Sequence, residues 1–409
     1  MQDNEKKPAL RFKGFTDPWE QRKVGTLIED YTEKTVTQNQ YPVLTSSQQQ
    51  GIVLQEDYFA DRQVTTDNNV GYYVLPKGYF TYRSRSDTDV FVFNRNNIVD
   101  KGIISYYYPV FAPKSCDSNF LLRRLNHGIK KQLSMAAEGT GQKVLAHAKF
   151  KNMVVDVPSQ SEQEKIGTIL EELDTLITLH QRKYEKLVNI KKSMLDKMFP
   201  KNGASVPEIR FKGFTDPWEQ RKLGDAFERV VRKNTNNESR LPLTISAQDG
   251  LVDQITYFNN RVASRDVSNY YLVYNGEFAY NKSTSDGYPF GAVKRLDWYE
   301  KGVLSTLYIV FALKHPEKDD SDFMTVFYDT DRWHRGVAER AAEGARNHGL
   351  LNISADDFFD IDTTMPEDKV EQEKIGRLLK KLDTLITLHQ RKLEKLQNIK
   401  KSCLEKMFV

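Results

Sequence analysis

Two long stretches of the chain repeat apolar residues with the heptad spacing of a coiled-coil helix. In residues 162–199, apolar side chains recur every seven positions in two series that lie four positions apart, and residues 371–408 repeat the pattern. This period predicts two long helices that pair with each other along a left-handed seam. Four further residues should widen this seam: Ile169, Leu176, Leu378 and Leu385. We expect the seam to contain Ile166, Leu173, Ile177 and Leu187 of the first helix and Ile375, Leu382, Ile386 and Leu396 of the second.

Each of these helices has a start signal. Ser159 with Glu162, and Asp368 with Glu371, have the spacing of a capping box and follow shortly after a proline. At ~1.5 Å per residue, a helix of 38 residues is about 57 Å long. That length corresponds to about 17 base pairs of B-DNA.

The blocks between the leaders and the helices mix strands with helices. Residues 270–280 read as two strands around Asn275 and Gly276, a signal for a type I′ hairpin, and residues 72–82 occupy the same place in the first block. Later in each block one helix is expected, and each should end at a glycine. These helices are residues 119–138, ending at Gly139, and residues 322–343, ending at Gly344.

Internal similarity indicates that one frame occurs twice. Residues 11–23, RFKGFTDPWEQRK, recur unchanged as residues 210–222, and the two helical segments are identical at 30 of 38 positions. The blocks at about 26–158 and 225–366, by contrast, agree only in outline. We therefore predict an α+β fold in which two similar mixed α/β domains, related by an internal pseudo-two-fold repeat, are joined by a long antiparallel two-helix coiled coil.

Composition excludes several classes of protein. Only two of the 409 residues are cysteines, Cys116 and Cys403, which argues against a disulfide framework and against a cysteine-based zinc site. There is no run of about 18 apolar residues and no secretory signal, so we expect no membrane span and a cytoplasmic location. Lys and Arg total 60 against 56 Asp and Glu, and this net charge of +4 is compatible with nucleic acid.

Motifs for catalysis are lacking. The glycine-rich turn of a methyltransferase and the phosphate-binding Gly-x4-Gly-Lys-Ser/Thr motif of an ATPase do not occur, and the histidines lack metal-ligand spacing. Asp362 with Glu367-x-Lys369 loosely resembles the magnesium site of a nuclease. Because this segment coincides with the helix start at Asp368 and has no counterpart in the first half, we favour a structural role. We predict no catalytic residue and no bound metal.

Polar residues in the blocks are the candidates for DNA contact. Two aligned tyrosines, Tyr82 and Tyr280, are followed directly by polar segments, and further donor-rich loops follow the block helices. Arg and Lys pair with guanine or phosphate, Asn with adenine, and hydroxyl groups with several bases. The candidates are Arg83, Arg85, Thr140, Gln142 and Lys143 in the first block, and Asn281, Lys282, Ser283, Arg346 and Asn347 in the second.

The repeated segments resemble those of a known family. RFKGFTDPWEQRKLG and EQEKIGRLLKKLDTLITLHQRKLEKL are similar to the specificity (S) subunit of type I restriction-modification enzymes, and the resemblance covers the whole chain. It implies target-recognition domains at residues 1–158 and 201–367 and conserved coiled-coil helices at residues 159–200 and 368–409. The first block keeps a Gly-Thr-x-Gln pattern at Gly139 that the second block lacks.

The resemblance implies a non-catalytic reader of double-stranded DNA. Each target-recognition domain would bind one half of an asymmetric bipartite site, and the helices would set the unread spacer. Two methyltransferase subunits, which bind S-adenosylmethionine, would dock on the helices, and restriction subunits that use ATP and Mg would join them. This chain would bind no cofactor itself. Two alternatives stay open at this point, a stand-alone DNA-binding nuclease and a structural coiled-coil adaptor.

Overall fold

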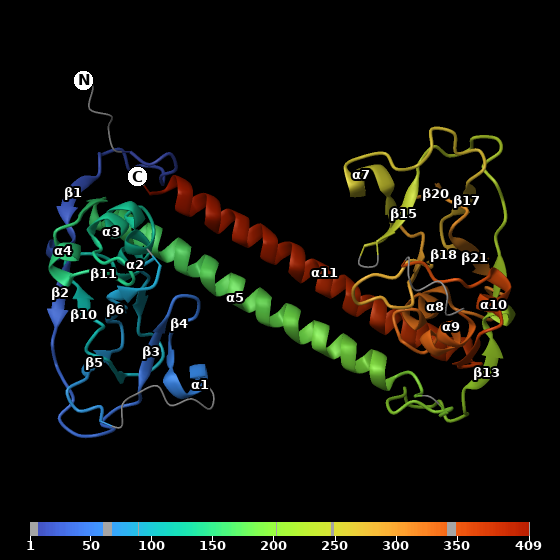
Figure 1. Ribbon diagram of the computed structural model, residues 1–409, viewed down its shortest axis with the longest axis horizontal. Helices are drawn as coiled ribbons and strands as arrows, with labels where there is room; N and C mark the ends of the chain where they lie inside the picture. Colours follow the sequence, from blue (N-terminus) through green and yellow to red (C-terminus); the bar gives the residue numbers. More distant parts are fainter. Residues whose placement is uncertain are drawn as a thin grey trace. The chain divides into compact units, whose positions relative to one another are not determined.

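The chain folds into two compact units. The computed structural model describes residues 7–59, 68–88, 90–201, 203–246, 249–341 and 349–408 (Figure 1). Unit 1 consists of Met1–Gln181 and Arg391–Val409, and unit 2 of Arg182–Gln390. Each unit thus contains one variable block together with a segment of each long helix, α5 (Gln160–Lys197) and α11 (Lys369–Lys406). The predicted mixture of strands and helices is confirmed.

Both blocks share one order of elements, except that two short strands of unit 1, Arg85–Ser86 and Lys143–Val144, have no counterpart among the described elements of unit 2. In unit 1 the elements that precede α5 are β1 (Glu20–Lys23), η1 (Val24–Thr26), β2 (Ile28–Tyr31), β3 (Leu44–Ser47), β4 (Gly51–Leu54), α1 (Gln55–Phe59), β5 (Tyr73–Pro76), β6 (Phe80–Tyr82), β7 (Arg85–Ser86), β8 (Phe93–Arg95), β9 (Lys101–Ile104), β10 (Val110–Pro113), α2 (Ser118–Asn126), α3 (Lys130–Ala136), β11 (Lys143–Val144), α4 (His147–Lys151) and β12 (Val154–Val157). In unit 2 the elements that precede α11 are β13 (Glu219–Lys222), α6 (Leu223–Ala226), β14 (Phe227–Arg229), β15 (Leu243–Ser246), β16 (Gly250–Asp253), α7 (Gln254–Phe258), β17 (Tyr271–Tyr274), β18 (Phe278–Asn281), β19 (Ala292–Arg295), β20 (Lys301–Leu304), β21 (Ile309–Leu313), α8 (Ser321–Phe327), α9 (His334–Arg340), α10 (Ala355–Phe359) and β22 (Asp362–Met365).

The sheets repeat as well. A four-stranded sheet has the order β2-β10-β6-β8 in unit 1 and β14-β21-β18-β19 in unit 2. The repeated leader supplies one strand in each unit, and this strand pairs antiparallel with the strand just before the long helix, β1 with β12 and β13 with β22. The leader therefore closes each block at the point where its helix begins.

The hairpin predicted at residues 270–280 is wrong in its pairing. Two strands do flank the turn at Asn275 and Gly276, and Gly276 has the positive φ of 85° that such a turn favours. However, β17 pairs with β20, whereas β18 pairs with β19 and β21 in another sheet. Unit 1 has the same arrangement, with β5 on β9 and β6 between β8 and β10. The turn therefore connects two sheets.

Each predicted block helix is also divided in two. In unit 1, Gly128 has a φ of 91° and separates α2 from α3, because a left-handed residue cannot continue a right-handed helix. In unit 2, the segment between Phe327 and His334 separates α8 from α9. Gly139, with a φ of 117°, lies just past α3 as expected, whereas Gly344 lies outside the described residues.

The long helices contribute to the core of both units. In unit 1, Ile166, Leu170 and Leu173 of α5 belong to one apolar cluster with Met407 and Phe408 from the other end of the chain. In unit 2, the last turns of α5 and the first turns of α11 share a second cluster in the same way. All eight predicted seam residues are buried or half-buried. Of the residues expected to widen the seam, Ile169, Leu378 and Leu385 are half-buried. The expected contribution of Leu176 is wrong, because its side chain is 42 % exposed.

One ion pair between the helices occurs in both units. Asp174 of α5 lies 2.5 Å from Lys400 of α11 in unit 1, and Asp383 of α11 lies 2.6 Å from Lys191 of α5 in unit 2. In the sequence repeat, these aspartates and lysines are equivalent to each other. Burial alone would lower the pKa of Lys191, but Asp329 and Asp383 outweigh it and raise that pKa. The positive charges of two lysines in the heptad seam are therefore balanced by aspartates on the other long helix.

We expect acid to weaken unit 1 through His127. Burial lowers the pKa of this half-buried imidazole from 6.5 to about 4, with Lys130, Lys400 and Arg123 adding to the effect and Asp174 opposing it. The unfolded chain therefore binds the proton more readily, and the free energy of unfolding should fall as the pH drops from about 6.5 to about 4. A urea titration at several pH values tests this expectation. His127→Asn should lose less stability over this range than the parent, and equal losses would contradict the assignment.

Candidate nucleic-acid interface

The polar residues predicted in the first block converge on one side of unit 1. Strand β7 pairs antiparallel with β11, so that Arg85 lies opposite Val144, and Lys143 lies opposite Ser86. Gln142 donates from Nε2 to Asp87 at 3.0 Å, and Arg83 lies 3.9 Å from the same carboxylate. Two segments almost 60 residues apart in the sequence therefore form one polar surface.

The loop between α3 and β11 is held in a tight turn. A backbone bridge joins Glu138 to Val144, and a side chain at Gly139 would collide with the carbonyl group of Gln142. Thr140, which was predicted as a DNA contact, lies exposed in this turn. The glycine is thus needed both for its positive φ and for the close approach of the backbone.

An aromatic pair supports the arginine of this surface. The guanidinium of Arg85 lies 4.3 Å from the centre of the Tyr107 ring, a cation–π geometry. The rings of Tyr106 and Tyr107 are 4.2 Å apart, and their side chains are 54 % and 40 % exposed. Ser84 donates from Oγ to the carbonyl oxygen of Tyr107 at 2.6 Å. Exposed aromatic residues beside a cation are frequent at nucleic-acid interfaces.

A cleft of about 510 Å³ opens beside Arg83 and Arg85. The turn between β3 and β4 lines its other side with Gln48 and Gln49, and Asn94 comes from β8. The sequence interpretation missed this turn. The three glutamines at residues 48–50, placed between two short apolar strands and followed by a glycine, are the signal that could have identified it.

A chain of polar contacts runs from the buried Tyr82 at the end of β6, just before Arg83, to the protein surface. The hydroxyl of Tyr82 lies 3.2 Å from Nδ1 of His147, whose Nε2 lies 2.9 Å from Asp30. Lys151 donates to the same carboxylate at 2.7 Å. Burial raises the pKa of Tyr82, and the nearby charge of Asp30 adds to this effect. The tyrosine that introduces the polar segment is therefore a fixed structural point.

In unit 2 the predicted residues are used differently. Asn281 accepts a hydrogen bond from the backbone of Ser283 at 3.0 Å, and Lys282 donates from Nζ to the carbonyl oxygen of Ile353 at 3.3 Å. Ser283 is exposed and forms a backbone bridge with Leu350. Beside this segment lies a cavity of about 570 Å³, partly lined by apolar residues. The two predicted contacts Arg346 and Asn347 lie outside the described residues.

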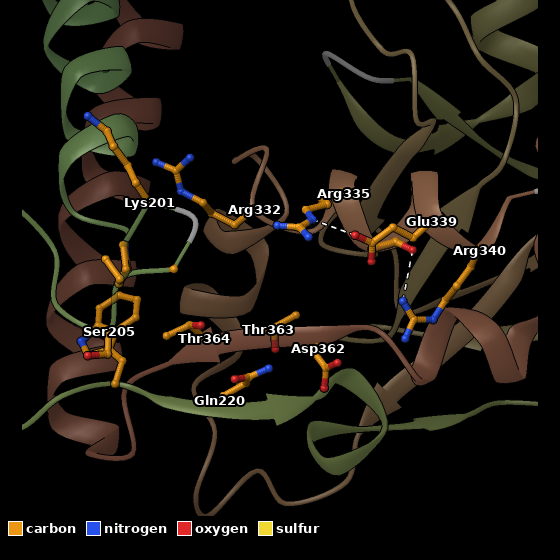
Figure 2. Close-up of a pocket in the computed structure, with 15 residues that line it drawn as sticks. Lys201, Ser205, Gln220, Arg332, Arg335, Glu339, Arg340, Asp362, Thr363 and Thr364 are labelled. Carbon is orange, nitrogen blue, oxygen red and sulfur yellow. Dashed lines mark hydrogen bonds and ion pairs between the residues drawn. The ribbon is translucent and has the colours of Figure 1, made fainter.

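Another pocket of unit 2, of about 390 Å³, gathers several basic side chains (Figure 2). It lies between the segment after α5, the strands β13 and β22, and helix α9. Its arginines already have acidic partners: Arg332 pairs with Asp331, Arg335 with Glu339, and Arg340 with Asp360. Because this positive charge is balanced internally, the pocket does not stand out as a site for a phosphate.

Residues of the repeated leader and of the first turn of each long helix hold each block against its helix, and we call this set of contacts the latch. In unit 1, Arg11 of the leader makes two hydrogen bonds, at 2.8 and 2.7 Å, with the buried carboxylate of Glu162, and this hydrogen bonding raises the pKa of Arg11. Gln163 accepts from the backbone of Asp117 at 3.0 Å and donates to Pro158 at 2.9 Å. The equivalent contacts in unit 2 join Arg210 with Glu371 and Gln372 with Asp320 and Pro366.

The contacts of two glutamates in the latch differ from the capping contacts that their spacing predicts. Glu162 and Glu371 were predicted to cap their helices, but their carboxylates bind the leader arginines instead. The capping-box spacing marks the helix starts correctly, because α5 and α11 begin at Gln160 and Lys369. Lys369, part of the nuclease-like fragment, donates from Nζ to the carbonyl oxygen of Pro316 at 2.7 Å.

Comparison with known proteins identifies the family. The model of the type I restriction modification DNA specificity domain matches residues 17–189, which cover the first block and most of α5. The repeated leader and helix carry the same frame into the second half. This match assigns the first block and most of α5 to the DNA specificity domain of type I restriction-modification systems. No curated protein sequence matches it.

A solved structure of a specificity subunit has the same fold. The S subunit of a type I restriction-modification system from M. genitalium is 13 % identical, and the match covers 98 % of this chain and 99 % of that chain with a TM-score of 0.59. The HsdS subunit of Thermoanaerobacter tengcongensis is 14 % identical, and here the match covers 95 % and 96 % with a TM-score of 0.43.

A specificity subunit recognises DNA and is not itself an enzyme; the catalytic activities reside in partner subunits. The alternatives of a stand-alone nuclease and a structural adaptor gain no support from these matches. Within the described parts of the chain, no group of His, Cys, Asp and Glu side chains is arranged to hold a metal ion. None of the helices in the described ranges is long and apolar enough to cross a membrane.

Proposed function

We propose that this specificity subunit reads an asymmetric, bipartite sequence in double-stranded DNA. Residues 1–158 and 201–367 act as target-recognition domains, and each reads one half of the site. The observation that carries this proposal is the contrast within the repeat. The leaders and helices are nearly identical, whereas the blocks keep one fold but present different side chains. Two unlike surfaces on one fold suit two unlike half-sites.

The DNA-contacting residues in this proposal are those of the polar surfaces beside Tyr82 and Tyr280. In the first block they lie on the surface formed by β7, β11 and the turn before β11, which supports a shared role. In the second block, Lys282 already donates a hydrogen bond within the protein, so it is a weaker candidate for DNA contact than the exposed Ser283. The proposed contacts are Arg83, Arg85, Thr140, Gln142, Lys143, Asn281, Lys282, Ser283, Arg346 and Asn347.

The helices of residues 159–200 and 368–409 provide the docking sites for partners in this proposal. Several exposed helix side chains are the same in both copies, although exposure means that packing between the helices does not require them. A partner that binds twice accounts for this identity, which suits two methyltransferase subunits. The residues concerned are Arg182, Lys183, Lys186, Asn189 and Lys192, and their equivalents Arg391, Lys392, Lys395, Asn398 and Lys401.

The partners supply the chemistry in the cytoplasm, where the DNA lies. Methyltransferase subunits bring S-adenosylmethionine and methylate adenine, and restriction subunits bring ATP and Mg to cut unmodified DNA. The chain itself contributes sequence recognition and the spacing of the two half-sites. Each helix has 38 residues and is about 57 Å long, enough to pass about 17 base pairs. The length of the helices would therefore set the unread spacer.

Mapping of methylated adenines by single-molecule sequencing tests this function. Cells that contain the modification subunits with this chain should show methylated adenines in one bipartite motif with an unread gap. Cells with the modification subunits alone should lack methylation at that motif, because the readers are missing. The same methylation pattern in both strains would contradict the proposed function.

A further inference from the structure

The cleft of unit 1 brings an arginine and a glutamine from distant parts of the sequence to one opening. Arg85 comes from β7, and Gln49 comes from the turn between β3 and β4. Both side chains are exposed. Ser47 organises the turn, because its Oγ accepts hydrogen bonds from the backbone of Gln49 and Gln50, both at 3.2 Å. The side chain of Gln49 therefore extends from a fixed backbone.

Arg85 is held in place without being neutralised. The ring of Tyr107 supports its guanidinium at 4.3 Å, and among the described residues no carboxylate forms an ion pair with it. The nearby Arg83, by contrast, lies 3.9 Å from Asp87. Stacking on an aromatic ring restricts the side chain but leaves the edge donors of the guanidinium available. Arg85 thus has the properties of a preorganised hydrogen-bond donor.

The two side chains have distinct partners in the DNA major groove. The forked donors of arginine match O6 and N7 of guanine, and the amide of glutamine matches N6 and N7 of adenine. The cleft also contains an amide already in use, since Asn94 donates from Nδ2 to Ser46 at 2.8 Å and to the carbonyl oxygen of Ser47 at 2.9 Å. Gln49 and Arg85 are therefore the cleft residues best suited to contact bases.

We propose that this cleft reads purines in the half-site bound by unit 1, with Arg85 contacting a guanine and Gln49 contacting an adenine. This inference rests on the proposed function and names the residues that set specificity within it. Tyr107 is a positioning residue, since it acts through Arg85. At the aligned positions unit 2 has Ser283 and Leu307, so this guanine contact belongs to the first half-site alone.

The test uses the full-length chain assembled with its modification subunits and a library of random DNA duplexes, from which bound molecules are selected and sequenced. Arg85→Lys keeps the charge but loses the forked donor. It should reduce the preference for one guanine by about 5- to 150-fold and leave the other half-site unchanged. Gln49→Ala should do the same for one adenine. Gln50→Ala is the matched control, because Gln50 shares the turn but does not line the cleft.

Tyr107 supplies a second measurement that folding defects alone would not mimic. Tyr107→Phe keeps the ring beneath Arg85 and should retain the guanine preference, whereas Tyr107→Ala should weaken it. If Arg85→Lys selects the parental motif with equal strength at every position, the proposed contact is wrong although the proposed function stands. Arg85→Ala could instead weaken binding to all sequences equally and make the binding constant depend less steeply on salt concentration. In that case Arg85 contacts phosphate, and the inference is overturned. If the parent complex enriches no sequence, the proposed function itself fails.

Discussion

Leu173→Asp is expected to destabilise the specificity subunit by about 3–5 kcal/mol and to abolish sequence-specific methylation. Leu173 is only 8 % exposed and packs in the core of unit 1 with residues from the first turns of α5 and from the C-terminal end of α11. An aspartate there would leave an unpaired charge in an apolar cluster, because the nearby Asp174 already binds Lys400. Denaturant unfolding followed by circular dichroism measures the loss of stability.

The same helix supplies the control for this substitution. Leu176 follows Leu173 by three residues, but its side chain is 42 % exposed. Leu176→Asp should therefore shift the unfolding midpoint far less than Leu173→Asp, although the chemical change is the same. Equal stability of the two variants, or normal methylation directed by Leu173→Asp, would show that this seam is not a packed interface.

Local patterns predicted the repeated frame well. The heptad spacing identified both long helices, because an apolar seam imposes a period that the sequence displays directly, and the capping-box spacing identified their starts. The latch formed by Arg11 and Glu162 was not predicted, since the two residues lie 151 positions apart. A glutamate three residues after a serine has the spacing of a capping box whether or not it caps the helix.

Strand pairing was harder to predict for the same reason. The turn at Asn275 and Gly276 is a local signal, and a turn does form there. Its two strands nevertheless pair with β20 and with β19 and β21, choices that depend on distant residues. The break after α2, by contrast, has a local cause, the positive φ of Gly128. A single glycine in a helical pattern was nevertheless too weak a signal to predict this break.

The candidate site was predicted in part. Residue chemistry pointed to Arg83 and Arg85 and to Gln142 and Lys143, but not to the pairing of β7 with β11 that joins them. The role of Tyr107 depends on a loop fold that sequence reasoning could not supply. The assignment of individual bases to these residues stays a prediction.

Each block should read its own half of the site, and a block exchange tests this expectation. Residues 26–158 are replaced by the corresponding block of another specificity subunit, and residues 11–23 and both long helices are kept. The donor block should retain the residues that the latch requires. These include an N-cap aspartate equivalent to Asp117, because Gln163 of α5 binds its backbone and Gly167 packs against it.

Mapping of methylated adenines in cells with the exchanged chain then decides the question. We predict that one half-site changes to that of the donor, while the other half-site and the gap stay as in the parent. The reciprocal exchange of residues 225–366 should change only the other half. A chimera that methylates a motif with both half-sites altered, or with neither altered, would contradict the account.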